Sequence, residues 1–166
     1  MKKALLIVFV FSIFCCNREE LPDYNSSLEE WNMLKDQNNN SYTYTVSTSS
    51  WTGFGTNTVL TIQNGVVISR VFEAYQLDET KGSTIITDSY FETSETLNTN
   101  ENGFATRTID DLYDTCIEDY LSVNKKDNTI FFETDDTGII SQCGFVPDDC
   151  ADDCFIGFNI SSFQWL

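Results

Sequence analysis

The chain has 166 residues, and its 26 acidic and 9 basic side chains give a formal net charge of −17 at pH 7. A surface this acidic repels phosphate backbones and anionic headgroups, which argues against a nucleic-acid partner. The chain has no histidine, which excludes Ser-His-Asp catalysis, Cys-His catalysis and histidine metal ligation. We therefore expect no enzyme activity, because catalysis would have to use carboxylates, Tyr, Lys or a free Cys.

The first residues have the organisation of a bacterial lipoprotein signal peptide. Two lysines precede the mostly apolar run 4–14, which is shorter than the roughly 20 residues of a membrane-spanning helix. Cys16 follows Ile13 by three positions and Cys15 by one, which resembles a lipid-attachment site. We predict that residues 1–15 are a signal peptide and that Cys16 is acylated, for example with palmitate. Cys15 is the alternative lipid site.

A short charged segment follows the predicted lipid site. Residues 17–20 read Asn-Arg-Glu-Glu, which resembles the tag that sends lipoproteins of Bacteroidetes-type bacteria to the outer face of the outer membrane. A multiply acylated cysteine gives stable anchoring, since each buried CH₂ contributes about 0.8 kcal/mol. We expect a surface-exposed protein of the outer membrane, with a periplasm-facing position as the alternative. Residues 16–26 are predicted to be a tether, and 27–166 to form one domain.

The first half of this domain is predicted to be a helix and a meander of strands. Ser27 and Glu30 have the spacing of a capping box, so we expect the helix to begin at Ser27 and to end at the asparagines 38–40. Asn64-Gly65 separates two β-rich runs and is the strongest short hairpin signal. Alternating apolar and polar residues predict strands at 42–47, 58–63, 66–77 and 84–93.

The second half begins with a polar segment and a clear helical pattern. Residues 94–107 are predicted to be a mobile connector, with a binding loop as the alternative. Thr108 and Asp111 have cap spacing, and apolar residues then recur at helical intervals as far as Leu121. Three more strands are predicted at 129–134, 139–145 and 155–165. The expected fold is α+β, with two helices packed on one face of an antiparallel sheet, in the order α-ββββ-α-βββ.

Four cysteines lie beyond the signal region. Outside the cytoplasm four cysteines predict disulfides, with three possible connectivities. Cys116 lies on the apolar stripe of its helix, and Cys143 lies on the expected core face of its strand. We predict the pairs Cys116–Cys143 and Cys150–Cys154, with crossed pairings such as Cys143–Cys150 still open.

Two further groups are candidate binding residues. Closely spaced carboxylates in a loop can hold Ca²⁺, which makes the acids around Cys150 a candidate metal site: Asp148, Asp149, Asp152 and Asp153. A solvated acidic turn is the alternative, and no other cofactor is expected. Trp51 and Phe54 lie between glycines in a predicted loop, where aromatic rings can stack on sugars or anchor a partner peptide.

Several stretches together resemble a bacterial family, the domain of unknown function 6174 family. They are Trp31, Tyr42–Val46, Asn64–Val67, Thr108–Asp114 and Phe132–Gly138. The chain departs from the family where it reads Gly138-Ile139-Ile140 instead of Gly-Tyr-Pro. The resemblance implies a secreted or lipid-anchored α+β protein, and it brings no activity and no catalytic residues.

These observations lead to three functional hypotheses. The first is an outer-membrane lipoprotein that acts as a binding or accessory module of the cell envelope, with an envelope protein or a glycan as ligand. The second is an inhibitor or chaperone-like module that faces the periplasm. The third and weakest is a carboxylate-based hydrolase, which would use the acids around Cys150.

Overall fold

The computed structural model describes residues 22–78, 80–152 and 154–166. The predicted signal peptide, the lipid site at Cys16 and the first part of the tether lie outside these residues. The described chain contains two α-helices and seven strands in the predicted α+β order. The elements are α1 (Pro22–Gln37), β1 (Tyr42–Ser49), β2 (Phe54–Gln63), β3 (Val66–Asp78), β4 (Ser83–Thr93), α2 (Ile109–Thr115), the π-helical turn η1 (Cys116–Tyr120), β5 (Asn128–Thr134), β6 (Ile140–Pro147) and β7 (Ile156–Trp165).

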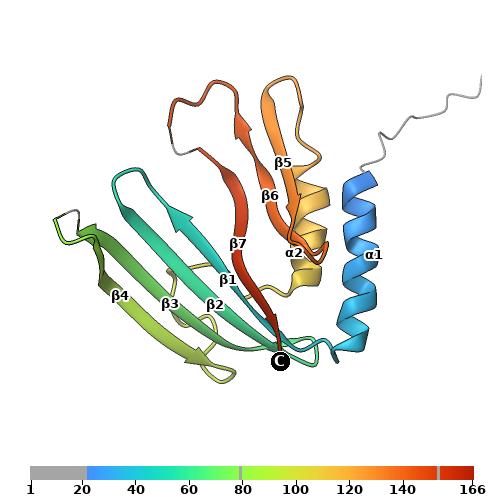
Figure 1. Ribbon diagram of the computed structural model, residues 1–166, viewed down its shortest axis with the longest axis horizontal. Coiled ribbons are helices and arrows are strands. Elements are labelled where there is room, and N and C mark those ends of the chain that lie inside the picture. The colour runs from blue at the N-terminus through green and yellow to red at the C-terminus, as the bar shows by residue number, and fades with distance from the viewer. Residues whose placement is uncertain (1–21, 79, 153) are drawn as a thin grey trace, which may run out of the picture.

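The seven strands form one antiparallel sheet in the order β4-β3-β2-β1-β7-β6-β5. Two meanders, β1 to β4 and β5 to β7, therefore meet in the middle of the sheet at β1 and β7 (Figure 1). The last residue is fastened there as well, because the Leu166 amide donates a hydrogen bond to the Ser41 carbonyl at 3.1 Å. The C-terminal strand thus joins the two halves of the molecule.

Both helices cover one face of the sheet, which holds the core (Figure 1). Alternation along β1 directs Tyr42, Tyr44 and Val46 into this core, because successive side chains of a strand point to opposite faces. Trp31 of α1 stacks on Trp165 of β7, with ring centroids 5.6 Å apart, and meets the Tyr42 ring edge-on at 5.2 Å. A layer of aromatic side chains therefore binds α1 to the two central strands.

The first helix begins earlier than the sequence predicts. It begins at Pro22, so Ser27 is an internal residue and the predicted capping box at Ser27 is wrong. The Ser27 hydroxyl is buried instead, where it lies 2.6 Å from the Tyr113 hydroxyl and donates a hydrogen bond to the Gly138 carbonyl at 2.7 Å. Ser27 therefore fastens α1 to α2 and to the β5–β6 turn instead of capping the helix.

The second helix confirms its predicted cap. The Thr108 hydroxyl accepts a hydrogen bond from the Asp111 amide at 3.2 Å, and the Asp111 carboxylate accepts one from the Thr108 amide at 2.7 Å. Beyond Thr115 the helix widens into η1, where the Leu121 amide donates to the Cys116 carbonyl. The predicted apolar stripe therefore continues, but through a π-helical turn.

Both predicted disulfides are present. Cys116–Cys143 joins the start of η1 to β6 with Cα atoms 5.8 Å apart, and Cys150–Cys154 closes the loop before β7. Disulfides persist in oxidising compartments and are rare in the cytosol, so this pair of bonds indicates an extracytoplasmic location. None of the helices in the described residues is long and apolar enough to cross a bilayer.

Candidate functional site

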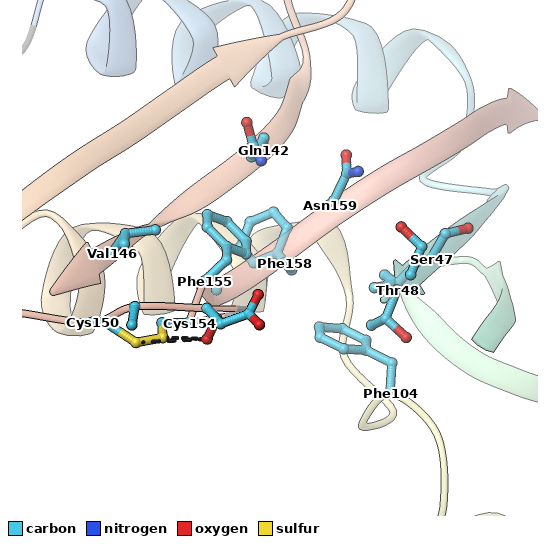
Figure 2. A pocket seen from close by; sticks show the side chains of 15 residues that line it. Ser47, Thr48, Phe104, Gln142, Val146, Cys150, Cys154, Phe155, Phe158 and Asn159 are labelled. Atoms are coloured by element: carbon cyan, nitrogen blue, oxygen red, sulfur yellow. Dashed lines mark hydrogen bonds between the residues drawn. A yellow bond between two sulfur atoms is a disulfide. The ribbon is translucent and has the colours of Figure 1, made fainter. Parts of the chain in front are cut away.

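A cleft of about 730 Å³ lies between β1 and β7, where the two halves of the sheet separate (Figure 2). β1 and β7 pair from Tyr42–Trp165 as far as Val46–Ile160, with an irregularity after Thr45. Beyond that point β1 continues beside β2 only, and the first residues of β7 lie beside β6 only. The divergence of two central strands therefore forms the cleft, and we call it the β1–β7 cleft.

Aromatic rings and uncharged polar groups line most of the β1–β7 cleft. Phe104 and Phe158 both line it and pack against each other edge-on, with ring centroids 6.4 Å apart (Figure 2). Ser47 and Thr48 of β1 line it on one side, and Gln142 of β6 and Asn159 of β7 line it on the other. This mixture of apolar surface with a few polar groups is typical of ligand-binding sites.

The segment between β4 and α2 positions Phe104. The Phe104 amide donates to the Thr58 hydroxyl at 2.9 Å, and its carbonyl accepts from the Arg70 guanidinium at 3.1 Å. Glu92 accepts hydrogen bonds from the Asn98 and Asn100 amides at 3.2 and 2.8 Å. Residues 94–107 are thus a loop fastened over β3 and β4, in contrast to the mobile connector that the sequence predicts.

A buried ion pair holds this loop. The Arg70 and Glu92 side chains are 3% and 1% exposed, and Nε of Arg70 lies 2.8 Å from Oε2 of Glu92. The Arg70 guanidinium, assisted by hydrogen bonds from Asn100 and Asn98, holds the pKa of the Glu92 carboxyl far below its usual range. Glu92 therefore stays ionised and continues to accept the hydrogen bonds of the loop.

The predicted acidic cluster contributes one described carboxylate to the cleft. Asp152 lines the β1–β7 cleft beside the Cys150–Cys154 disulfide, whereas Asp148 accepts a hydrogen bond from the Thr129 hydroxyl at 3.2 Å. Asp153 lies outside the described residues. Among the residues that the structure describes, no group of three or more acids or cysteines is placed to hold a metal ion.

The predicted aromatic site lies elsewhere. Trp51 is 76% exposed in the β1–β2 turn and Phe54 is 44% exposed at the start of β2, and neither lines the cleft. Gln76 pairs with both Phe54 and Ile85, which places these side chains on one face at the same end of the sheet. The structure therefore separates the two candidate groups that the sequence singled out.

The buried tyrosines serve the core rather than the cleft. Burial raises the pKa of Tyr113 to about 12, and it also raises the pKa of Tyr42 and Tyr44. Each donates or accepts a hydrogen bond: the Tyr44 hydroxyl donates to the Arg107 carbonyl at 2.6 Å, and the Tyr42 hydroxyl accepts from the Ile109 amide at 2.9 Å. These phenols remain protonated, and those of Tyr42 and Tyr44 join the start of α2 to the sheet.

Comparison with protein-family models, curated proteins and solved structures finds no match to this chain. Function must therefore be argued from the cleft itself. Sequence reasoning missed its central residues, Phe104, Gln142, Phe158 and Asn159. Phe104 carried a signal, because it is the one aromatic residue in the polar segment 94–107, whereas Asn159 is one of several polar residues in its strand and carried none.

Proposed function

We propose that this protein is a lipid-anchored binding module of the bacterial outer membrane, and that the β1–β7 cleft holds its ligand. The observation that carries this proposal is the cleft: about 730 Å³ between two central strands, lined by aromatic rings and uncharged polar side chains. The lipid-site spacing at Cys16 and the charged segment 17–20 support the anchor and its position at the cell surface. The two disulfides agree with an envelope location.

The lining favours binding over catalysis. Asp152 is the one carboxylate from the described residues that lines the cleft. Hydrolysis by carboxylates in the manner of glycosidases needs a pair of acids on either side of the scissile bond. The arrangement in the described chain instead offers recognition groups, so a carboxylate-based hydrolase is the weakest candidate.

Crosslinking on intact cells tests the role of the cleft. The photoreactive residue benzoylphenylalanine replaces Thr48, which lines the cleft, or Thr84, an exposed threonine on β4 that serves as the matched control. We expect irradiation to give an adduct from the Thr48 position and none from the Thr84 position, as read by mass spectrometry of the purified full chain. If Thr48 gives no adduct beyond that of Thr84, the cleft is not a binding site in the cell.

The anchor and its orientation have separate tests. Mass spectrometry of the mature protein should find an acylated N-terminal Cys16, and a Cys16→Ala variant should leave the membrane fraction. Protease treatment of intact cells should degrade a surface-displayed protein. Protection from the protease, together with intact acylation, would instead favour the periplasm-facing inhibitor or chaperone-like module.

A further inference from the structure

The β1–β7 cleft is bounded by two strand edges that no neighbouring strand covers. Residues 47–49 of β1 pair with β2 alone, and residues 156–159 of β7 pair with β6 alone. At the closed end the Ser47 and Ser161 hydroxyls lie 2.6 Å apart, and the Ser161 hydroxyl donates to the Thr45 carbonyl at 3.4 Å. Because a strand carries backbone donors and acceptors along both edges, both sides of the cleft present main-chain groups that a further strand would satisfy.

Two side-chain amides add to these main-chain groups. Gln142 of β6 and Asn159 of β7 are direct cross-strand partners, and both line the cleft (Figure 2). Neither of these side-chain amides makes a hydrogen bond to any other part of the described chain. A primary amide offers two donors and an acceptor, so it can bond to both the N–H and the C=O of a peptide unit.

The dimensions suit a short extended segment. Each uncovered edge spans three or four residues, which at about 3.3 Å per residue corresponds to roughly 10–13 Å of strand. Recognition by strand addition draws affinity from main-chain hydrogen bonds and specificity from pockets for alternate side chains. Phe158 is only 2% exposed, so its ring is closed to the face-on stacking that binds a sugar, and the apolar surface available to a ligand side chain comes from Phe155, which is 36% exposed.

The electrostatic field selects the charge of the ligand. Asp152 lines the cleft, and no lysine or arginine does so in the described residues. Asp148 and Asp149 are exposed in the same loop, and the whole chain carries a net charge of −17. A field of this sign attracts cations and repels acidic segments.

We infer that the β1–β7 cleft binds an extended peptide segment that carries a lysine or arginine side chain. The segment lies between β1 and β7 and forms main-chain hydrogen bonds with their uncovered edges. Gln142 and Asn159 bond to its peptide units, and its cationic side chain lies near Asp152. This inference rests on the proposed function of the cleft and names the class of its ligand.

A peptide library tests the inference with the full chain in detergent micelles. Acetylated and amidated hexapeptides in a positional-scanning library are measured by fluorescence anisotropy. We expect pools with lysine or arginine to bind, and exchange of lysine for glutamate to weaken the best binder about tenfold or more. Hydrogen–deuterium exchange should show protection at residues 47–49 and 156–159. If no pool binds, the inference is wrong.

Two matched comparisons separate main-chain pairing from other contacts. N-methylation of alternate amides in the best peptide, which removes N–H donors, should weaken binding about tenfold or more. The Gln142→Leu/Asn159→Leu variant should weaken binding to a similar degree. The control variant Gln37→Leu/Gln63→Leu, which changes two exposed amides outside the cleft, should bind as the unchanged chain does. Equal binding of methylated and unmethylated peptide would overturn the inference.

A sugar probe separates this inference from the proposed function. Tetra-N-acetylchitotetraose is measured in the same assay, and we expect no binding. If this sugar binds in the cleft and no peptide pool does, the peptide inference is wrong, but the proposal of a binding module is kept. Absence of the Thr48 photoadduct on cells would reject the binding module itself.

Discussion

Arg70 and Glu92 show how single residues in the core of the β1–β4 half determine the shape of a distant surface. The ion pair is covered by the 94–107 loop, and the loop carries Phe104 to the cleft. Burial of two charges costs free energy. Here the two charged side chains also make hydrogen bonds with main-chain groups of the loop, which in a mobile segment would bond to water. The pair therefore holds a connector in place as part of the lining of the cleft.

Removal of one partner of the Arg70–Glu92 ion pair should lower the free energy of unfolding substantially. Glu92→Ala leaves the Arg70 guanidinium buried and unpaired, and we expect a loss of about 3 kcal/mol in the free energy of unfolding. Urea denaturation followed by fluorescence measures this loss. Glu95→Ala, which changes an exposed acid of the same loop, should stay within about 0.5 kcal/mol of the parent. Equal effects of the two substitutions would contradict the role of the ion pair.

The same carboxylate should make the protein sensitive to acid. The pKa of Glu92 is lowered in the folded state from an ordinary value of 4.5. Below that value the unfolded chain takes up the proton first, so this contribution is fully present above pH 4.5 and is lost as the pH falls toward the folded-state pKa. We expect the free energy of unfolding of the parent to fall more steeply between pH 5 and pH 2 than that of Glu92→Gln. Parallel curves in a series of urea denaturations would show that Glu92 makes no such contribution.

At the scale of elements, the two disulfides have different tasks. Cys116–Cys143 spans 27 residues and joins the helical layer to the sheet, whereas Cys150–Cys154 spans 4 and shapes a loop at the cleft. A crosslink stabilises mainly by restricting the unfolded chain, and the effect grows with the length of the closed loop. The first bond therefore belongs to the core and the second to the site.

Paired substitutions test this division. Cys116→Ala/Cys143→Ala should lower the free energy of unfolding by about 3–4 kcal/mol, and Cys150→Ala/Cys154→Ala by about 2 kcal/mol. Thermal unfolding monitored by circular dichroism ranks the two variants. The second variant should also change peptide affinity, because its disulfide lines the cleft. A greater loss of stability in the second variant would show that Cys150–Cys154, and not Cys116–Cys143, is the disulfide that stabilises the core.

For the whole molecule, β7 is the element on which both halves depend. It pairs with β1 on one side and β6 on the other, and it supplies Trp165 to the aromatic layer beneath α1. Without it the two meanders share no strand. The point at which β7 leaves β1 also opens the cleft, so one strand both joins the sheet and forms the site.

Truncation tests this dependence. A chain that ends at residue 155 lacks β7 and should lose its cooperative thermal transition, because the remaining strands form two separate sheets with an exposed core. A chain that lacks only Leu166 should keep the transition, since it loses a single terminal hydrogen bond. Differential scanning calorimetry compares the two. A sharp transition in the shorter chain would show that the helical layer alone holds the halves together.

Sequence by itself determined the order and type of the elements and the cap at Thr108, and it favoured the cysteine pairing that the structure then selected over the crossed alternatives. These features depend on local period, local hydrogen bonds and the face of an element on which a residue lies. The start of α1 escaped prediction because Ser27 finds partners on Tyr113 and Gly138, far away in the chain.

Only the tertiary structure decided where the site lies. Asn159 and its partner Gln142 lie near the end of β1 because β7 returns to the middle of the sheet, and strand order is not written in any local pattern. Phe104 reaches the cleft because a buried ion pair, whose members are 22 residues apart, fastens its loop. The period of a sequence shows on which face of its own strand or helix a side chain lies. Which side chains of different strands come into contact depends on how the strands are arranged in the sheet.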